Sequence, residues 1–99
     1  MLTGKQKRYL KSLAHHYQPV MQIGKGGISE NFIYTFEDAL EAHELVKISV
    51  LSNNMESKSK LSNILCESTN SDLVQIIGNQ LIFYRKSLKK DKEKRINLP

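Results

Sequence analysis

A glycine-rich turn with one lysine, G-K-G-G at residues 24–27, has the clearest potential for chemistry in this sequence. Glycine has no Cβ, so the main chain at such a turn can come very close to a ligand. The turn follows a short apolar run that predicts a buried strand, Val20 to Ile23, and it precedes Ser29 and a helical pattern. A helix that starts there offers unpaired N–H groups and the positive end of its dipole. This corner therefore suits an anion, above all a phosphate.

The spacing of the glycines does not fit two common nucleotide-binding motifs. A P-loop needs G-x-x-x-x-G-K-[ST], which the chain lacks. The dinucleotide motif G-x-G-x-x-G would need glycine at position 29, which is Ser29, and an acidic residue after the second strand. What remains is G-x-x-G, a spacing that clamps the nucleic-acid backbone in KH domains. A tight strand-to-helix turn without a ligand can have the same spacing, so the motif alone leaves both interpretations open.

The other reactive side chains do not predict a catalytic, metal or cofactor site. His15 and His16 are adjacent, so on a helix they diverge, and no H-x₃-H or C-x₂-C spacing is present. Cys66 lies in an apolar helical pattern, which predicts a reduced, half-buried thiol. We expect the carboxylates of the second helix to form a solvated face that points away from any nucleic acid. These are Glu37, Asp38, Glu41 and Glu44.

The net charge of +5 is concentrated at one end of the chain. Residues 1–84 contain eight basic and eight acidic residues, whereas residues 85–99 contain seven basic and two acidic ones. Residues 1–29 contain five basic residues and no acidic one. Such segregation favours a polyanionic partner, most simply nucleic acid, although a basic tail can also serve solubility.

The first helix is predicted to have one apolar and one basic face. Thr3 and Gln6 fit a capping box at its start. Its apolar positions are Leu10, Leu13, Ala14 and Tyr17. The opposite side carries Lys7, Arg8, Lys11 and His15.

The remaining patterns predict a compact α/β domain with the order α-β-α-β-α-β-β. Alternation over 45–51 predicts a strand, a turn cluster at 52–54 precedes a third helix, and Gly78-Asn79 joins two final strands as a hairpin. Strands joined through helices should be parallel, and the hairpin makes the last strand antiparallel. We expect a four-stranded mixed sheet with three helices over residues 1–85, followed by a flexible basic tail, residues 86–99.

Four blocks resemble the YhbY family, also called the CRM domain: L-A-H-H-Y-Q-P-V (13–20), I-G-K-G-G-I-S-E (23–30), H-E-L-V-K-I-S-V (43–50) and V-Q-I-I-G-N-Q-L-I-F-Y-R (74–85). The resemblance runs from about Leu2 to Arg85. It implies an RNA-binding domain associated with assembly of the large ribosomal subunit. It also implies a fold similar to the C-terminal domain of bacterial translation initiation factor three. The G-x-x-G loop of the family maps onto Gly24, Lys25, Gly26 and Gly27.

The hypothesis from the sequence is a cytoplasmic, monomeric and non-enzymatic protein that binds ribosomal RNA of the large-subunit precursor. It needs no cofactor, metal or small-molecule substrate, and no apolar run or leader pattern predicts contact with a membrane. The alternative is a small basic module that docks on a ribosomal protein or assembly factor. The expected RNA-binding residues are Gly24, Lys25, Gly26, Gly27, Lys5, Lys7, Arg8, Lys11, Arg85 and Lys86.

Overall fold

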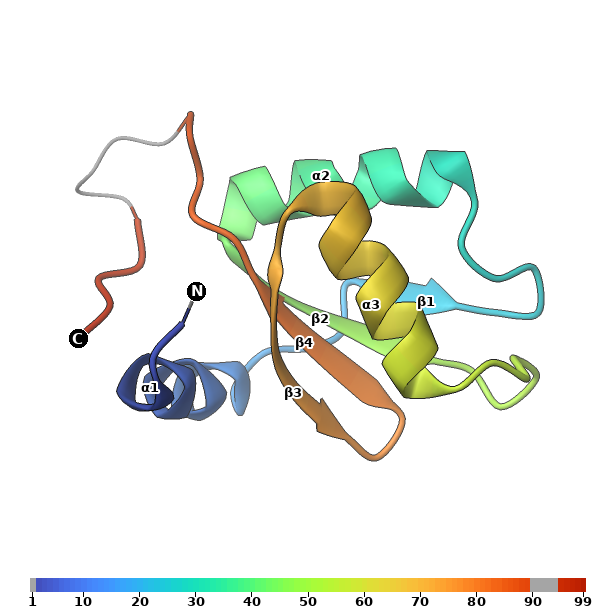
Figure 1. Ribbon diagram of the computed structural model, residues 1–99, viewed down its shortest axis with the longest axis horizontal. Coiled ribbons are helices and arrows are strands. Elements are labelled where there is room, and N and C mark those ends of the chain that lie inside the picture. Colours follow the sequence, from blue (N-terminus) through green and yellow to red (C-terminus); the bar gives the residue numbers. More distant parts are fainter. Residues whose placement is uncertain (1, 90–94) are drawn as a thin grey trace.

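A mixed β-sheet with helices on both faces forms the framework of the domain (Figure 1). A computed structural model describes residues 2–89 and 95–99. Within these residues the elements are α1 (Gly4–Ala14), β1 (Met21–Ile23), α2 (Glu30–His43), β2 (Leu45–Val50), α3 (Lys58–Thr69), β3 (Asp72–Ile77) and β4 (Gln80–Tyr84). The predicted order and the mixed four-stranded sheet are confirmed.

The strand order in the sheet is β1-β2-β4-β3. β1 is parallel to β2, with Met21 opposite Ile48, as their helical connection predicts. β4 turns back from β3 through the hairpin at Gly78, where φ is +57°, and pairs antiparallel with both β3 and β2. β2 and β3 therefore run in the same direction but are not neighbours, because β4 lies between them.

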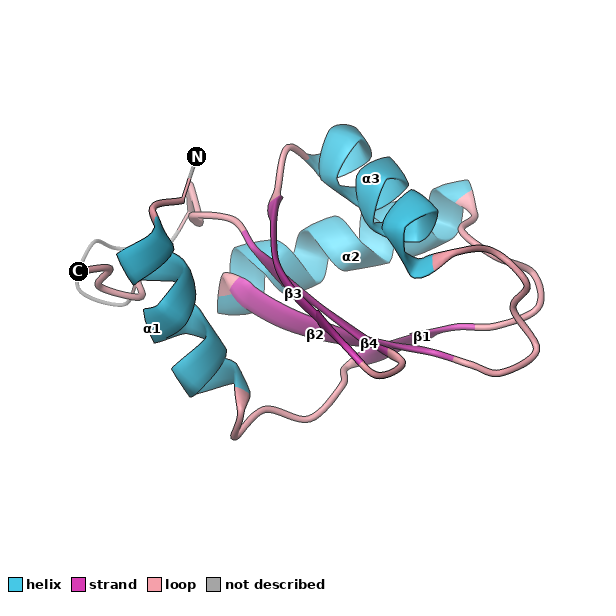
Figure 2. Cartoon of the chain, turned by 60° about the horizontal axis from the view of Figure 1, so that its bottom comes forward, coloured by secondary structure: helices cyan, strands magenta, loops and turns pink. Residues whose placement is uncertain are grey.

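Helices cover both faces of the sheet, with α1 on one face and α2 and α3 on the other (Figure 2), and an apolar cluster lies on each face. α2 and α3 pack on one face, where Phe36 meets Phe83 edge-on with ring centroids 5.1 Å apart. α1 packs on the other face, with Leu10 and Ala14 against Ile82. Since alternate strand residues point to opposite faces, both sides of the central strands carry buried apolar residues.

α1 begins as predicted but ends before Tyr17. Thr3 accepts from the N–H of Gln6, and the Gln6 side chain accepts from the N–H of Thr3, which completes the capping box. The helix ends at Ala14, and Tyr17 follows it with 37% of its surface exposed. The prediction that Tyr17 belongs to the buried stripe of the helix is wrong, because the chain has left the helical path there.

The carboxylates of α2 do not form a uniformly solvated face. Glu44 is fully buried and accepts hydrogen bonds from the N–H groups of Ser87 (2.7 Å) and Ile96 (2.6 Å). It follows α2 with a positive φ of 63°, a rare conformation for a residue with a side chain. The sequence-based interpretation of Glu44 as exposed is wrong, since the C-terminal segment folds back over it.

Glu41 binds the same returning segment. Its carboxylate accepts from the Ser87 hydroxyl at 2.7 Å and from the N–H of Leu88 at 3.2 Å. These hydrogen bonds, led by the one from Ser87, together with the Arg85 charge, lower the pKa of Glu41. Further on, Ile96 and Leu98 pack against the α1 cluster. We name the described residues Arg85–Lys89 and 95–99 the C-terminal strap. The flexibility expected for residues 86–99 stays a prediction, and residues 90–94 lie outside the described residues.

Candidate nucleic-acid interface

The glycine turn joins β1 directly to the start of α2. The N–H of Gly27 donates to the carbonyl of Gly24 at 3.1 Å, which closes the turn. Gly27 has φ of +72°, a value that favours glycine. Ser29 caps α2, because its hydroxyl accepts from the N–H of Phe32 at 3.0 Å. The predicted strand, turn and capped helix start are therefore confirmed.

Gly26 differs from Gly27 in what the fold requires. Its φ is not in the positive range, and a Cβ built there would meet nothing within 4 Å. A Cβ at Gly24 would reach Leu51 at 3.6 Å, an ordinary contact. Neither backbone conformation nor packing therefore explains glycine at position 26. A surface point without a side chain is what close approach of a ligand to the main chain requires.

A second loop holds the turn from the side. The side-chain amide of Asn54, between β2 and α3, donates to the carbonyl of Gly24 at 2.8 Å. The other end of that amide accepts from the N–H of Glu56 at 2.9 Å, which fixes its orientation. Figures 1 and 2 both show the two loops together at one end of the molecule. From the sequence, Asn54 is expected only in a turn, because no local pattern indicates a contact across 30 residues.

The charges at this tip are sparse. Lys25 is exposed, and no carboxylate of the described chain lies within ion-pair distance of it. Glu30 lies in the first turn of α2, where its carboxylate accepts from the Tyr34 hydroxyl at 3.0 Å. Glu56 pairs with Lys60 at 3.2 Å. Lys25 therefore supplies a positive charge within the turn itself, and Glu30 places a negative charge in the first turn of the helix that follows.

The basic residues of α1 lie far from the glycine turn. Figures 1 and 2 show α1 at one end of the longest axis and the β1–α2 loop at the other, and that axis extends 39 Å. One phosphate cannot touch both regions, so a ligand that contacts both must be extended. The α1 side chains in question are all exposed: Lys5, Lys7, Arg8 and Lys11.

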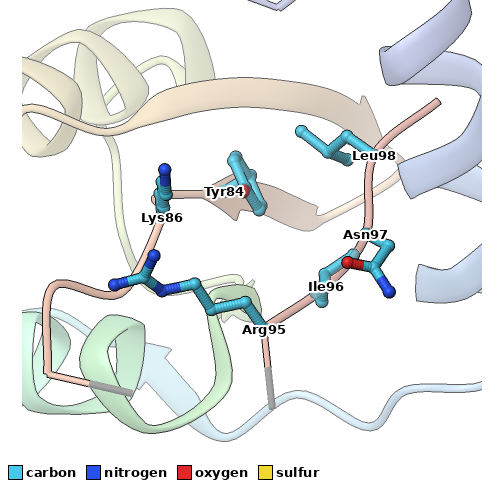
Figure 3. Close-up of a pocket in the computed structure, with 6 residues that line it drawn as sticks. All are labelled: Tyr84, Lys86, Arg95, Ile96, Asn97 and Leu98. Atoms are coloured by element: carbon cyan, nitrogen blue, oxygen red, sulfur yellow. The ribbon is translucent and has the colours of Figure 1, made fainter. Parts of the chain in front are cut away.

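Arg85 and Lys86 are adjacent in sequence but have different environments. The guanidinium of Arg85 donates to the carbonyl of Thr69 at 2.8 Å and pairs with Glu41 at 3.3 Å and Glu37 at 3.6 Å. The Arg85 charge is thus paired with carboxylates of α2, and these contacts hold the strap against the helix. Lys86 is exposed and borders a hollow of about 240 Å³ that Tyr84 and strap residues 95–98 also line (Figure 3). Burial, followed by the nearby Glu44 carboxylate, raises the pKa of Tyr84.

No group of three or more His, Cys, Asp or Glu side chains is placed to hold a metal ion in the part of the chain that the structure describes. In the same residues, none of the helices combines the length and the apolar character needed to cross a bilayer. Burial raises the pKa of the Cys66 thiol, which makes it a poorer nucleophile.

The fold and the site define a small α/β domain with a glycine-rich strand–turn–helix corner. This chain belongs to the CRS1 / YhbY (CRM) domain family, whose model matches residues 2–85. The predicted resemblance is thereby confirmed. The fold is also shared with a solved structure, the protein SAV1595 from Staphylococcus aureus. That protein is 56% identical, its TM-score is 0.81, and the match covers 100% of both chains.

Two further relatives match over nearly their whole length. The "Probable RNA-binding protein YqeI" of Bacillus subtilis is 48% identical over 99 residues, with 100% of both chains covered. The "RNA-binding protein" of Haemophilus influenzae is 40% identical over 98 residues, with 99% of this chain and 95% of the relative covered.

Proposed function

We propose that this protein binds RNA without catalysing a reaction, and that the glycine turn contacts the RNA backbone. The observation that carries the proposal is the exposed main chain at Gly26, where the fold itself has no need of glycine. Lys25 beside it supplies a positive charge, and the first N–H groups of α2 supply donors. The names of two relatives, which contain the words RNA-binding protein, support the RNA-binding part of the proposal.

The proposed RNA surface is distributed along the molecule. A phosphate at residues 24–27 and other phosphates at the exposed cations of α1 lie at opposite ends of the domain (Figure 2). Lys86 adds a further exposed cation, on the strap itself. We assign Arg85 a positioning role, because carboxylates and a carbonyl already hold its guanidinium. Recognition would rest mainly on backbone and shape.

The finer part of the proposal concerns the RNA itself. We propose ribosomal RNA of the large-subunit precursor as the partner, with a role in assembly of that subunit. The support is the resemblance of four sequence blocks to a family with this association. Immunoprecipitation of the tagged protein followed by sequencing of bound RNA tests it. Enrichment of large-subunit precursor RNA is expected, and enrichment of unrelated transcripts alone would refute it.

The binding mode is tested by RNA affinity as a function of salt. We compare wild type with the double variant Lys25→Asp, Gly26→Asp, which circular dichroism should show to be folded. The wild-type slope of log K against log salt should be about −0.7 per phosphate contact with a single strand. The variant should lose most of the affinity. Suppose that both proteins bind RNA with the same affinity, and that affinity falls only when the lysines of 86–94 are replaced by glutamine. The turn then has a structural role and does not contact RNA.

An apolar feature supports a second candidate, a protein-docking module. Met55, in the loop that holds the glycine turn, is 94% exposed, and Leu51 nearby is 37% exposed. A contiguous exposed apolar patch marks a protein-contact site, and these two side chains belong to one loop, between β2 and α3. Nuclease treatment of ribosomal particles separates the candidates. Release of the protein by nuclease favours RNA binding, and retention favours a protein partner.

A further inference from the structure

A buried lysine with no acidic partner among the described residues lies on the sheet face that α1 covers only in part. Lys47, in the middle of β2, is 8% exposed, and its ammonium donates to the carbonyl of Tyr17 at 3.0 Å. An ammonium has three donor hydrogens, so the carbonyl occupies one of them. In the described chain no carboxylate forms an ion pair with Lys47. Burying an unpaired cation is unfavourable, and an anionic ligand would offset that cost.

Lys47 borders two surface hollows, whose lining among the described residues includes no acidic group. One, of about 240 Å³, is formed largely by residues 17–20 and 43–45. The other, of about 180 Å³, lies between the end of α1 and the β3–β4 hairpin, and neither contains Asp or Glu. The polar residues of the second hollow are Lys11, His15, Gln75 and Gln80, together with Lys47.

We propose that this sheet face is a second RNA-binding site, centred on Lys47, that takes a backbone phosphate. Lys47 and Lys11 would supply the positive charge, and the amides of Gln75 and Gln80 are suited to donate to phosphate oxygens or a 2′-hydroxyl. The inference rests on the proposed function, because it assumes that the same RNA contacts the glycine turn.

The course of β2 connects the two sites. Lys47 lies mid-strand, and β2 ends beside the glycine turn, where the N–H of Leu51 donates to the carbonyl of Ile23 at 2.9 Å. An RNA strand that follows β2 would pass from the turn to Lys47 and then to Lys11 on α1. The glycine turn and α1 are far apart, so an RNA that contacts both must be extended. Lys47 would give such an RNA a contact between the two.

The test is Lys47→Met, which keeps an unbranched side chain of similar length and removes the charge. Replacing a buried charge by an apolar side chain is often neutral or stabilising, so the melting temperature should stay or rise. RNA affinity should fall about fivefold to tenfold, and the salt slope should shrink by about 0.7. Lys89→Met, which removes an exposed charge from the strap, is the matched control and should cost less than about twofold.

A structural role for Lys47 would give a different result. If Lys47 serves only to bind the Tyr17 carbonyl, Lys47→Met lowers the melting temperature and binds RNA like Lys89→Met, which overturns the inference. If Lys47→Met does not fold, the Cε NMR signal of Lys47 in labelled wild type decides. A shift on titration with RNA that Lys11→Gln weakens supports the site, and an unmoved signal refutes it.

The same measurements test the proposed contact at the glycine turn independently of the Lys47 site. The variant Lys25→Asp, Gly26→Asp is measured with the same RNA. If that variant loses affinity while Lys47→Met behaves like its control, only the second site is refuted. If neither loses affinity, both proposals fall.

Discussion

The side-chain amide of Asn54 donates a 2.8 Å hydrogen bond to the carbonyl of Gly24, the first residue of the glycine turn. The same carbonyl accepts from the N–H of Gly27 at 3.1 Å. One backbone oxygen thus joins the turn to itself and to the loop between β2 and α3. The proposed phosphate contact depends on this arrangement, because a preorganised loop loses less conformational entropy on binding.

Asn54→Asp should detach the turn from the loop. The substitution keeps the oxygen that accepts from Glu56, but it places a second oxygen against the Gly24 carbonyl. We expect a loss of about 1–3 kcal/mol in the free energy of unfolding, together with weaker RNA binding. Denaturant titration and RNA affinity measure the two effects. Asn53→Asp adds the same charge at the neighbouring exposed position, and an equal effect there would contradict the assignment.

Alanine at the two adjacent glycines should give opposite results. The φ of +72° at position 27 strains any residue with a side chain. Gly27→Ala should therefore lower the free energy of unfolding by about 1–2 kcal/mol. Gly26→Ala meets open space and should leave the stability unchanged or slightly increased. It should nevertheless weaken RNA binding, because a methyl group would stand between main chain and ligand. Thermal melts and binding titrations test this, and unaffected binding by Gly26→Ala would argue against close approach.

Glu30→Gln should strengthen RNA binding. Glu30 places a negative charge at the first turn of α2, beside the proposed phosphate position. Its removal should raise affinity about twofold to threefold at low salt, with less gain at high salt. The variant should lose about 0.3–1 kcal/mol of stability, since an acidic residue favours a helix start. Glu67→Gln on α3 changes the same charge elsewhere. If both variants bind equally well, the gain reflects net charge alone.

Acid should loosen the C-terminal strap at Glu41. The pKa of this carboxyl is lowered in the folded protein, chiefly by the Ser87 hydroxyl. A carboxyl whose folded pKa is below its unfolded pKa contributes stability above the unfolded value, and this is lost as pH falls through the folded value. The stability difference between wild type and Glu41→Gln should therefore be larger at pH 7 than at pH 3. Denaturant titrations at both values measure it, with Asp38→Asn as an exposed control that should show no such change.

The sequence alone was sufficient for the local features of this protein. The capping box at Thr3 and the Ser29 cap follow from side chains that bind nearby backbone groups. The hairpin at Gly78 follows from the positive φ that glycine adopts without strain. Apolar periodicity likewise predicted the order of helices and strands, because it reflects which residues face the core. The glycine turn could be found for the same reason, since its conformation is set within a few residues.

Tertiary structure decided the contacts between distant segments. It placed β4 between β2 and β3, brought Asn54 to Gly24, folded the strap over Glu44 and buried Lys47 in the sheet. None of these has a local signal: Glu44 matches an exposed helical position, and Lys47 matches the polar half of an alternating strand. Their environment depends on which surfaces pack together, and that is determined by burial of apolar area over the whole chain rather than by neighbouring residues.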